Sequence, residues 1–206
     1  MFLSLYSFLR WCPGGLGIFL RQKIYPSFLG SCGKKILIGR FVTINNPQKI
    51  SLGNNVIIND KVVLDPTESS LKLNPVIALE DQTFIGTGSR LQTSSGTITI
   101  RTGCSIGSFC DFQATGTIII EEQTLLAAFC RIGHLPTTAT QSKESITIAS
   151  GCWLGVRSII MPGVTVGTGS IIGAHAVVKE SLPANIVAVG TPAKVLRNRF
   201  EEQADP

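Results

Sequence analysis

From Ile148 onward, the chain repeats every six residues. One aliphatic side chain occupies the same place in each unit, at Ile148, Leu154, Ile160, Val166, Ile172 and Val178. Four positions later stands a second recurring set, mostly small, at Cys152, Ser158, Val164, Ser170 and Ala176. Neither an α-helix nor an ordinary strand needs a period of six. Three such units form one triangular coil of a parallel β-helix, in which the aliphatic side chain points inward and the small one fits where the wall bends.

The same pattern, less regular, extends towards the N-terminus and predicts one all-β solenoid. It is legible at Ile38-Gly39, Ile58-Asn59, Ile85-Gly86, Ile106-Gly107 and Leu126-Ala127. We therefore expect a β-helix over residues 36–190, with about eight coils stacked ~4.8 Å apart. Two stretches break the pattern, at residues 65–74 and 134–145. The second is polar, and we expect it to project from the coil as a loop.

Both ends of the solenoid are expected to be helical. Residues 1–35 carry no repeat and predict a cap of two short amphipathic helices, at 1–11 and 16–28, because a terminal coil would otherwise expose its core. After the last coil, Thr191 is a suitable N-cap and Pro192 a suitable first helical residue. Residues 191–206 are therefore expected to form a C-terminal helix and tail.

Composition narrows the class of partners. Hydrophobic residues make up 44% of the chain and charged residues 15%, which suits a β body whose outer walls are partly buried against copies of itself. The net charge is +5, but the basic residues are scattered, which argues against a nucleic-acid partner. Residues 1–28 combine apolar and basic side chains and offer a possible peripheral contact with a membrane. The apolar members are Phe2, Leu3, Leu5, Phe8, Leu9 and Trp11, near Arg10, Arg21 and Lys23.

The cysteines follow the repeat rather than a disulfide framework. Cys104, Cys110, Cys130 and Cys152 each stand four residues after an aliphatic repeat position, where a thiol acts as a small buried apolar group. With no CxxC motif, no apolar segment of about 18 residues and no secretory signal, the sequence predicts a cytoplasmic protein. No metal is expected, because the chain has two histidines and the zinc carbonic anhydrases built on a β-helix need three.

Residues 151–197 resemble the C-terminal half of the hexapeptide-repeat O-acetyltransferases, a family that includes galactoside, maltose and exopolysaccharide acetyltransferases. The resemblance rests on Cys152-Trp153-Leu154-Gly155, Pro162-Gly163-Val164, Ile172-Gly173-Ala174, Pro183-Ala184-Asn185 and Gly190-Thr191-Pro192-Ala193-Lys194. It implies a left-handed β-helix, an exception to the usual right-handed crossover. It also implies a homotrimer that binds acetyl-CoA between neighbouring prisms and acetylates a saccharide, as in polysaccharide biosynthesis.

The resemblance also implies roles for single residues. His134 corresponds to the family's catalytic histidine, Trp153 to a tryptophan of the acceptor pocket, and Asp111 to a position near the acceptor. Ala174 corresponds to a backbone contact with the pantetheine arm of the cofactor. Lys194 and Arg197 correspond to basic residues near its phosphates. Val156 and Lys179 replace a serine and a threonine that contact the cofactor in relatives, so Val156 can offer only its backbone and Lys179 can still meet a phosphate.

The expected chemistry needs a general base. A sugar hydroxyl attacks a thioester only if its proton is removed, and imidazole, with an ordinary pKa of about 6.5, is suited to that role. His134 opens the polar loop, whereas His175 lies inside the repeat and is expected to be a surface or subunit-contact residue. Asp111 could orient the imidazole or hold the acceptor. Three alternatives stay open: a noncatalytic trimeric scaffold, a different acyl donor such as acyl-ACP, and an amino-sugar acceptor.

Overall fold

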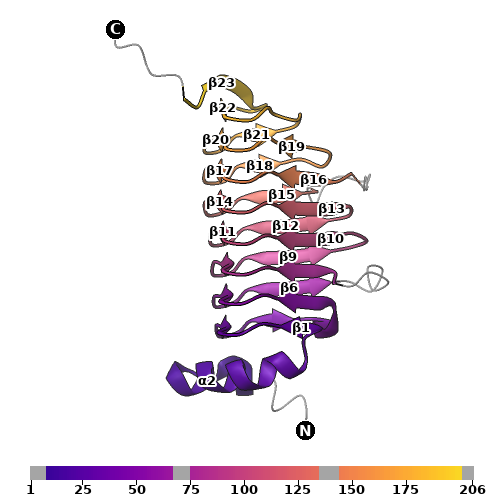
Figure 1. Ribbon diagram of the computed structural model, residues 1–206, viewed down its shortest axis with the longest axis vertical. Coiled ribbons are helices and arrows are strands. Elements are labelled where there is room, and N and C mark those ends of the chain that lie inside the picture. The colour runs from indigo at the N-terminus through magenta and orange to yellow at the C-terminus, as the bar shows by residue number, and fades with distance from the viewer. Residues whose placement is uncertain (1–7, 67–74, 135–143, 201–206) are drawn as a thin grey trace.

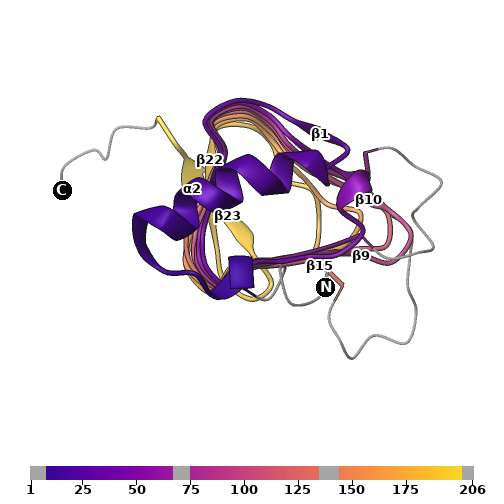
Figure 2. The same ribbon diagram turned by 90° about the horizontal axis from the view of Figure 1, so that it is seen from below.

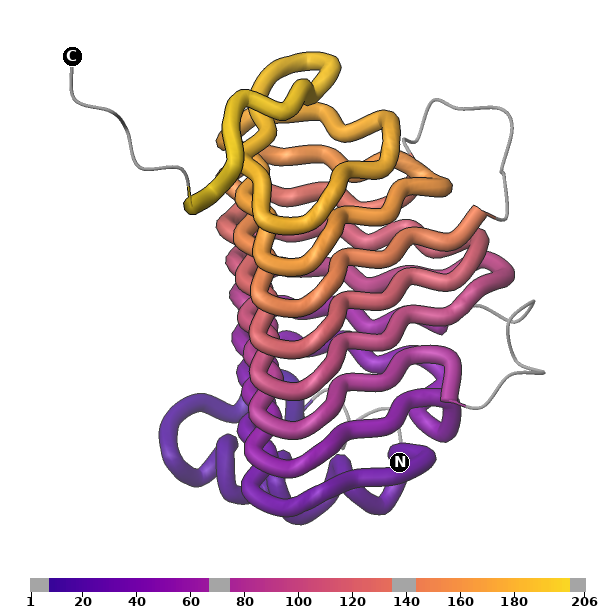
Figure 3. The backbone as a smooth tube through the Cα atoms, turned by 45° about the horizontal axis from the view of Figure 1, so that its top comes forward, coloured from indigo at the N-terminus to yellow at the C-terminus, as the bar shows by residue number. Residues whose placement is uncertain are grey.

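A computed structural model describes residues 8–66, 75–134 and 144–200 of the chain. Three β-sheets form the walls of a triangular prism, which the chain climbs in successive coils (Figures 1 and 3). Sheet A contains β1 (Ser31–Cys32), β4 (Ile50–Leu52), β7 (Ile77–Leu79), β10 (Thr97–Ile100), β13 (Thr117–Ile120), β16 (Ile146–Ile148) and β19 (Thr165–Val166).

The other two walls follow the same order. Sheet B contains β2 (Leu37–Ile38), β5 (Ile57–Ile58), β8 (Phe84–Ile85), β11 (Ser105–Ile106), β14 (Leu125–Leu126), β17 (Trp153–Leu154), β20 (Ile171–Ile172), β22 (Ile186–Val189) and β23 (Lys194–Asn198). Sheet C contains β3 (Thr43–Ile44), β6 (Val63–Pro66), β9 (Arg90–Thr93), β12 (Asp111–Ala114), β15 (Arg131–Gly133), β18 (Ile159–Ile160) and β21 (Val177–Val178). Successive strands of a wall pair in parallel, apart from β22 and β23.

The six-residue repeat places equivalent side chains above one another. Ile148 pairs with Val166 in sheet A, and Leu154 with Ile172 in sheet B. All six aliphatic positions of the C-terminal repeat are fully buried, and they stack into one apolar core along the prism. The predicted fold class, a left-handed parallel β-helix, is confirmed. Earlier coils are longer because the turns from sheet C to sheet A contain extra residues, as at 94–96 and 115–116.

The four cysteines at small repeat positions are buried, as predicted. None of the cysteines in the described part of the chain forms a disulfide. Burial raises the pKa of the Cys104 thiol to about 11 and raises that of Cys152 as well. The thiols of Cys104 and Cys152 therefore stay protonated at neutral pH and pack as small apolar groups.

A helical cap closes the lower end of the prism. It consists of a helical turn at residues 8–11, α2 (Gly14–Ile24) and the 3-10 helix η1 (Tyr25–Ser27). Seen from below, α2 lies across the open end of the first coil (Figure 2). The first strand begins at Ser31, before the expected boundary at residue 36, because β1 already pairs with β4. Residues 1–7 of the expected first helix lie outside the described residues. A second 3-10 helix, η2 (Pro47–Lys49), connects sheets C and A.

Arg21 holds the cap on the first coil. Its side chain is 1% exposed, and it donates hydrogen bonds from Nη1 to the carbonyl oxygens of Leu9 (2.8 Å) and Cys12 (2.9 Å). Its Nε donates to the carbonyl oxygen of Ile38 in β2 (2.7 Å). One buried guanidinium therefore links the helical turn, α2 and the first coil.

The predicted C-terminal helix is wrong. Residues 194–198 form β23, which pairs antiparallel with β22, for example Val189 with Lys194. No helix follows Thr191 for it to cap, and its hydroxyl instead donates to the carbonyl oxygen of His175 (3.2 Å). The last parallel strand of a solenoid leaves an open edge of backbone donors and acceptors. The hairpin satisfies that edge, and this gain overrides the local helix propensity.

Arg40 and Asp60 connect the first two coils through a bidentate contact. The guanidinium donates to Asp60 Oδ2 from Nε (3.1 Å) and Nη2 (3.0 Å), and the Arg40 backbone N–H donates to Oδ1 (2.7 Å). Burial by itself raises the pKa of the Asp60 carboxyl, but the Arg40 donors outweigh it and hold this pKa below its ordinary value. The carboxylate therefore stabilises the fold above its unfolded pKa, and this contribution is lost as the pH falls through the lowered folded value.

We expect Asp60→Asn to lower the free energy of unfolding at neutral pH by about 0.5 kcal/mol, because the pair is partly exposed and screened. In acid, where both states of the wild-type carboxyl are protonated, the variant and the wild type should converge. Thermal unfolding followed across this pH range checks the prediction. A difference that does not change with pH would contradict it.

Candidate functional site

His134 leaves the prism at the corner where sheet C turns into sheet A. It follows directly on β15, and its backbone N–H donates to the carbonyl oxygen of Gln113 (3.4 Å). The preceding Gly133 has a φ of 108°, and a Cβ atom there would collide with the same carbonyl oxygen. Only glycine fits this close approach, so Gly133 determines where the chain leaves the coil and where His134 begins its loop. The loop residues 135–143 lie outside the described residues.

Asp111 belongs to a polar strip on the outer face of sheet C. Its Oδ2 accepts an ion-paired contact from Arg131 Nη2 (3.0 Å), and its Oδ1 accepts a hydrogen bond from Gln113 Nε2 (3.0 Å). Gln113 Nε2 also donates to Gln92 Oε1 (2.9 Å), and Gln92 Nε2 to Asp65 Oδ2 (3.1 Å). The strip therefore runs over several coils and ends beside Gly133 and His134.

Asp111 was predicted from the sequence as a site residue, whereas Arg131, Gln113 and Gln92 were not. A signal for Gln92 and Gln113 was present, because β9 and β12 alternate buried residues, among them Leu91 and Phe112, with outward polar ones. Such alternation is typical of a half-exposed strand. It does not indicate by itself which outward residues meet across coils.

Trp153 lies on a different wall. It is the first residue of β17 in sheet B, is 51% exposed, and is flanked by Leu125 below and Ile171 above. The equivalent outward positions of this wall are mostly apolar: Leu37, Ile57, Phe84, Leu125, Trp153, Ile171 and Val187. Sheet B thus presents an apolar outer row to solvent in the single chain.

Val156 and Ala174 occupy the corner between sheets B and C, one coil apart. Both lie in turns, and the His175 N–H donates to the carbonyl oxygen of Val156 (2.8 Å). His175 is exposed at the same corner. Arg157 also belongs to this corner, with its guanidinium 5.5 Å from the ring centroid of Phe129, which stacks on Phe109 with the centroids 5.3 Å apart.

The remaining expected cofactor residues divide between two walls. Lys194 and Arg197 lie on β23, at the upper end of sheet B. Lys179 follows β21 and extends sheet C above His134. The hairpin, not the expected helix, therefore carries the two basic residues.

In a triangular prism, each wall faces away from the opposite edge. Sheet B is opposite the C–A corner, where β15 ends and His134 follows (Figure 2). Trp153 and His134 consequently lie on opposite sides of one chain, and no movement of side chains can bring them together. Asp111 and His134, by contrast, share one face.

Three comparisons with known proteins agree with this fold. Residues 145–180 match the bacterial transferase hexapeptide family (six repeats). Over 80% of the chain, it is 29% identical to a probable acetyltransferase of Mycobacterium tuberculosis, of which it covers 50%. It is 27% identical to a putative colanic acid biosynthesis acetyltransferase of Escherichia coli, covering 85% of the chain and 73% of that protein. It is 46% identical to the galactoside O-acetyltransferase of Escherichia coli over 25% of the chain and 26% of that protein.

Among solved structures, the chain is similar to an N-acyltransferase of Bacillus cereus. The TM-score is 0.60 at 22% identity, with 87% of this chain and 88% of that chain covered. That structure contains dTDP-4-amino-4,6-dideoxyglucose and coenzyme A. At this identity the likeness extends to the fold alone.

The chain folds as a left-handed β-helix, and residues 145–180 of it match the hexapeptide-repeat family. The predicted resemblance to the acetyltransferases of this class is confirmed by the family match and by the relatives. The chain spans about half the length of the mycobacterial relative. Among residues 8–66, 75–134 and 144–200, no helix is long and apolar enough to cross a bilayer, and no group of three or more His, Cys, Asp or Glu side chains gathers as metal ligands.

Proposed function

We propose that this protein transfers an acetyl group from acetyl-CoA to a hydroxyl of a saccharide, such as a lipid-linked or polysaccharide precursor, with His134 as general base. The observation that carries the proposal is the position of His134. His134 follows β15 in the hexapeptide repeat and lies beside the outward strip of carboxylate, amide and guanidinium groups on sheet C. Such a strip offers the donors and acceptors that a polyhydroxylated ligand requires.

The reaction needs no covalent enzyme intermediate. His134 takes the proton of the acceptor hydroxyl as its oxygen attacks the carbonyl carbon of the thioester. When the tetrahedral intermediate collapses, the C–S bond breaks and the imidazolium returns the proton to the departing sulfur. Holding both substrates side by side makes the attack effectively unimolecular, which lowers the barrier further. Asp111 is proposed to hold the acceptor or to orient the imidazole.

We propose that the site is completed by a second copy of the chain, in a homotrimer. The apolar outer row of sheet B supports this assembly, because such a row is costly to leave in water. The opposite placement of Trp153 and His134 also supports it, since only a neighbouring prism can bring a sheet B wall against a C–A corner. A cyclic trimer would form three equivalent sites of this kind.

The cofactor is proposed to lie in the groove between two prisms. Val156 and Ala174 would contact the pantetheine arm through their backbones, since both lie in turns at one corner. Lys194 and Arg197 would meet the phosphates from the upper end of sheet B, and Lys179 could contribute from sheet C. Their cationic side chains suit the negative charge of coenzyme A.

The direct test is release of the coenzyme A thiol from acetyl-CoA in the presence of a panel of saccharides and glycolipids. An acceptor-dependent rate, together with an acetylated product in the mass spectrum, is the expected result. Alkaline treatment then separates an ester on oxygen from an amide on nitrogen, and longer acyl-CoA or acyl-ACP donors define the donor. Absence of transfer to every acceptor and from every donor would favour the noncatalytic scaffold.

Mixed trimers test whether the site is shared. We expect His134→Ala and Trp153→Ala each to be weakly active alone, because every site then lacks one residue. When the two variants are unfolded together and refolded in equal amounts, about one quarter of the interfaces should regain both native residues. Activity should recover to that fraction of wild type. If both residues came from the same chain, the mixture would gain nothing over the separate variants.

A further inference from the structure

The solvent-facing side of α2 is unusually apolar for the end of a solenoid. Its inner side buries Gly17 and Arg21 against the first coil. Its outer side exposes Leu16 by 65% and Phe19 by 55%. We name as the cap patch the exposed large apolar residues of the N-terminal cap: Phe8, Trp11, Leu16, Ile18, Phe19 and Phe28.

Capping elements of solenoids ordinarily present a polar outer face, which keeps the chain soluble. Exposed apolar side chains gathered at one end of a molecule, here on the helical turn at 8–11, α2 and Phe28, mark a surface that contacts something else. The helix α2, which carries Leu16, Ile18 and Phe19 of the cap patch, lies at the base of the prism, below β1 (Figure 1). It is far from the upper hairpin and takes no part in the proposed catalytic site.

Charge is segregated along the same axis. The first 59 residues contain seven basic residues and no Asp or Glu, since the first acidic residue is Asp60. The remaining residues contain 11 of the 18 basic residues and all 13 acidic ones. The base of the prism is therefore strongly positive, whereas the rest is close to neutral.

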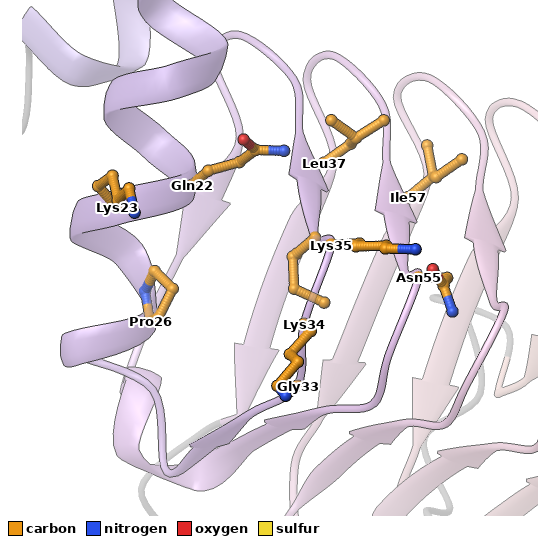
Figure 4. Close-up of a pocket in the computed structure, with 10 residues that line it drawn as sticks. Gln22, Lys23, Pro26, Gly33, Lys34, Lys35, Leu37, Asn55 and Ile57 are labelled. Carbon is orange, nitrogen blue, oxygen red and sulfur yellow. The ribbon is translucent and has the colours of Figure 1, made fainter.

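Part of this charge surrounds a pocket beside the cap. The pocket, of about 640 Å³, lies between α2 and the first two coils. Lys23 of α2 and the consecutive Lys34 and Lys35 of the first coil line it, together with Gln22 and Asn55 (Figure 4). Its lining contains no acidic residue. Three ammonium groups and two amides around one cavity suit a phosphate group.

We propose that the base of the prism docks on an anionic phospholipid bilayer. The cap patch enters the boundary between headgroups and acyl chains, and Lys23, Lys34 and Lys35 meet the lipid phosphates at its rim. This combination of an apolar face and flanking lysines is that of an interfacial helix. The surface differs from the sequence expectation, because Leu9 and Arg21 are buried and cannot reach a lipid.

A bilayer fits this surface better than a second copy of the chain. Two bases packed against each other would bring two acid-free, lysine-bearing surfaces together, and their repulsion would oppose the contact. An anionic lipid surface instead attracts each lysine. The proposal does not depend on the acetyltransferase activity.

Flotation with vesicles of phosphatidylcholine alone and of phosphatidylcholine mixed with phosphatidylglycerol tests the proposal. We expect the wild type to bind the anionic vesicles at least about 10-fold more strongly, with binding that weakens as salt increases. Phe19→Glu and the double variant Lys34→Gln/Lys35→Gln should each lose about 10-fold in binding. Phe200→Glu is the matched control, because Phe200 is an exposed aromatic at the opposite end of the prism, and it should bind like the wild type.

Trp11 provides an independent readout. The chain contains two tryptophans, so Trp153→Phe leaves Trp11 as the sole reporter. Its emission should shift to shorter wavelength, and brominated lipids should quench it, with anionic vesicles but not with inorganic phosphate alone. Equal binding to neutral and anionic vesicles would overturn the proposal. So would unchanged binding of folded Phe19→Glu, or a loss of self-association in that variant without a loss of vesicle binding.

Discussion

Replacing His134 by alanine is expected to reduce turnover by about 10²–10⁴-fold, the usual contribution of a general base. The methyl side chain of alanine cannot accept the proton of the acceptor hydroxyl, so the hydroxyl attacks the thioester without general base catalysis. The coil should persist, because His134 is outside the buried core and Gly133, not His134, makes the close backbone approach at this corner.

The chain provides its own control for this variant. His175 is the second of two histidines and is exposed at the B–C corner, where the proposed mechanism gives it no proton to move. We expect His175→Ala to keep turnover within a few-fold of wild type. Steady-state kinetics should assign the His134 effect to kcat, with acetyl-CoA binding preserved in a separate titration. Full turnover in His134→Ala, with the oligomer intact, would refute the assignment of the base.

Replacing Arg21 by methionine is expected to lower the free energy of unfolding by about 3 kcal/mol, because hydrogen bonds to a charged group are each worth about 1.5–3 kcal/mol and buried acceptors would lose their donor. The carbonyl oxygens of Leu9, Cys12 and Ile38 all depend on this guanidinium. Methionine keeps an unbranched side chain as far as the position of Nε, so most of the loss reports the polar contacts of the guanidinium.

Lys23→Met is the matched control, since Lys23 lies on the same helix but is exposed. Its effect on stability should stay within about 0.5 kcal/mol. Denaturant unfolding measures both variants, and Trp11 fluorescence in a Trp153→Phe background reports whether the cap detaches before the coil unfolds. If Arg21→Met were as stable as Lys23→Met, the guanidinium would not be what holds the cap in place.

The β-helix could be predicted from the sequence because its repeat depends only on residues that are close together in the chain. Each hexapeptide forms one short strand and one corner, so Leu154 and Ile160 reveal their inward positions without reference to distant residues. Cys130 and Cys152 were recognisable as core residues for the same reason. The exit of His134 was also legible, since the six-residue count stops at Gly133 and resumes only at Ile146.

The end of the chain was misread because its conformation depends on a distant partner. Thr191 and Pro192 are good helix-start residues, but the segment that follows lies beside the open edge of β22. Strand pairing there satisfies backbone groups that a helix would leave exposed. Local propensity is a weak prior when an unpaired edge is available.

The polar strip on sheet C depends on stacking in the same way. Asp111 meets Arg131 because one coil places them side by side, and Gln113 meets Gln92 through the coil below. The turns between coils vary in length, so the residues that face one another could not be paired by counting in sixes. Register between coils is a property of the folded prism.

The amino-acid sequence by itself determined the coil, its inward side chains and the histidine that leaves it, because each of these follows from a short periodic rule. Only the tertiary structure decided that Trp153 and His134 occupy opposite sides of the prism and that β23 closes its top. It also decided that the cap turns Leu16 and Phe19 outward. These features depend on which wall a residue reaches and what lies next to it, and a periodic pattern carries no information about either.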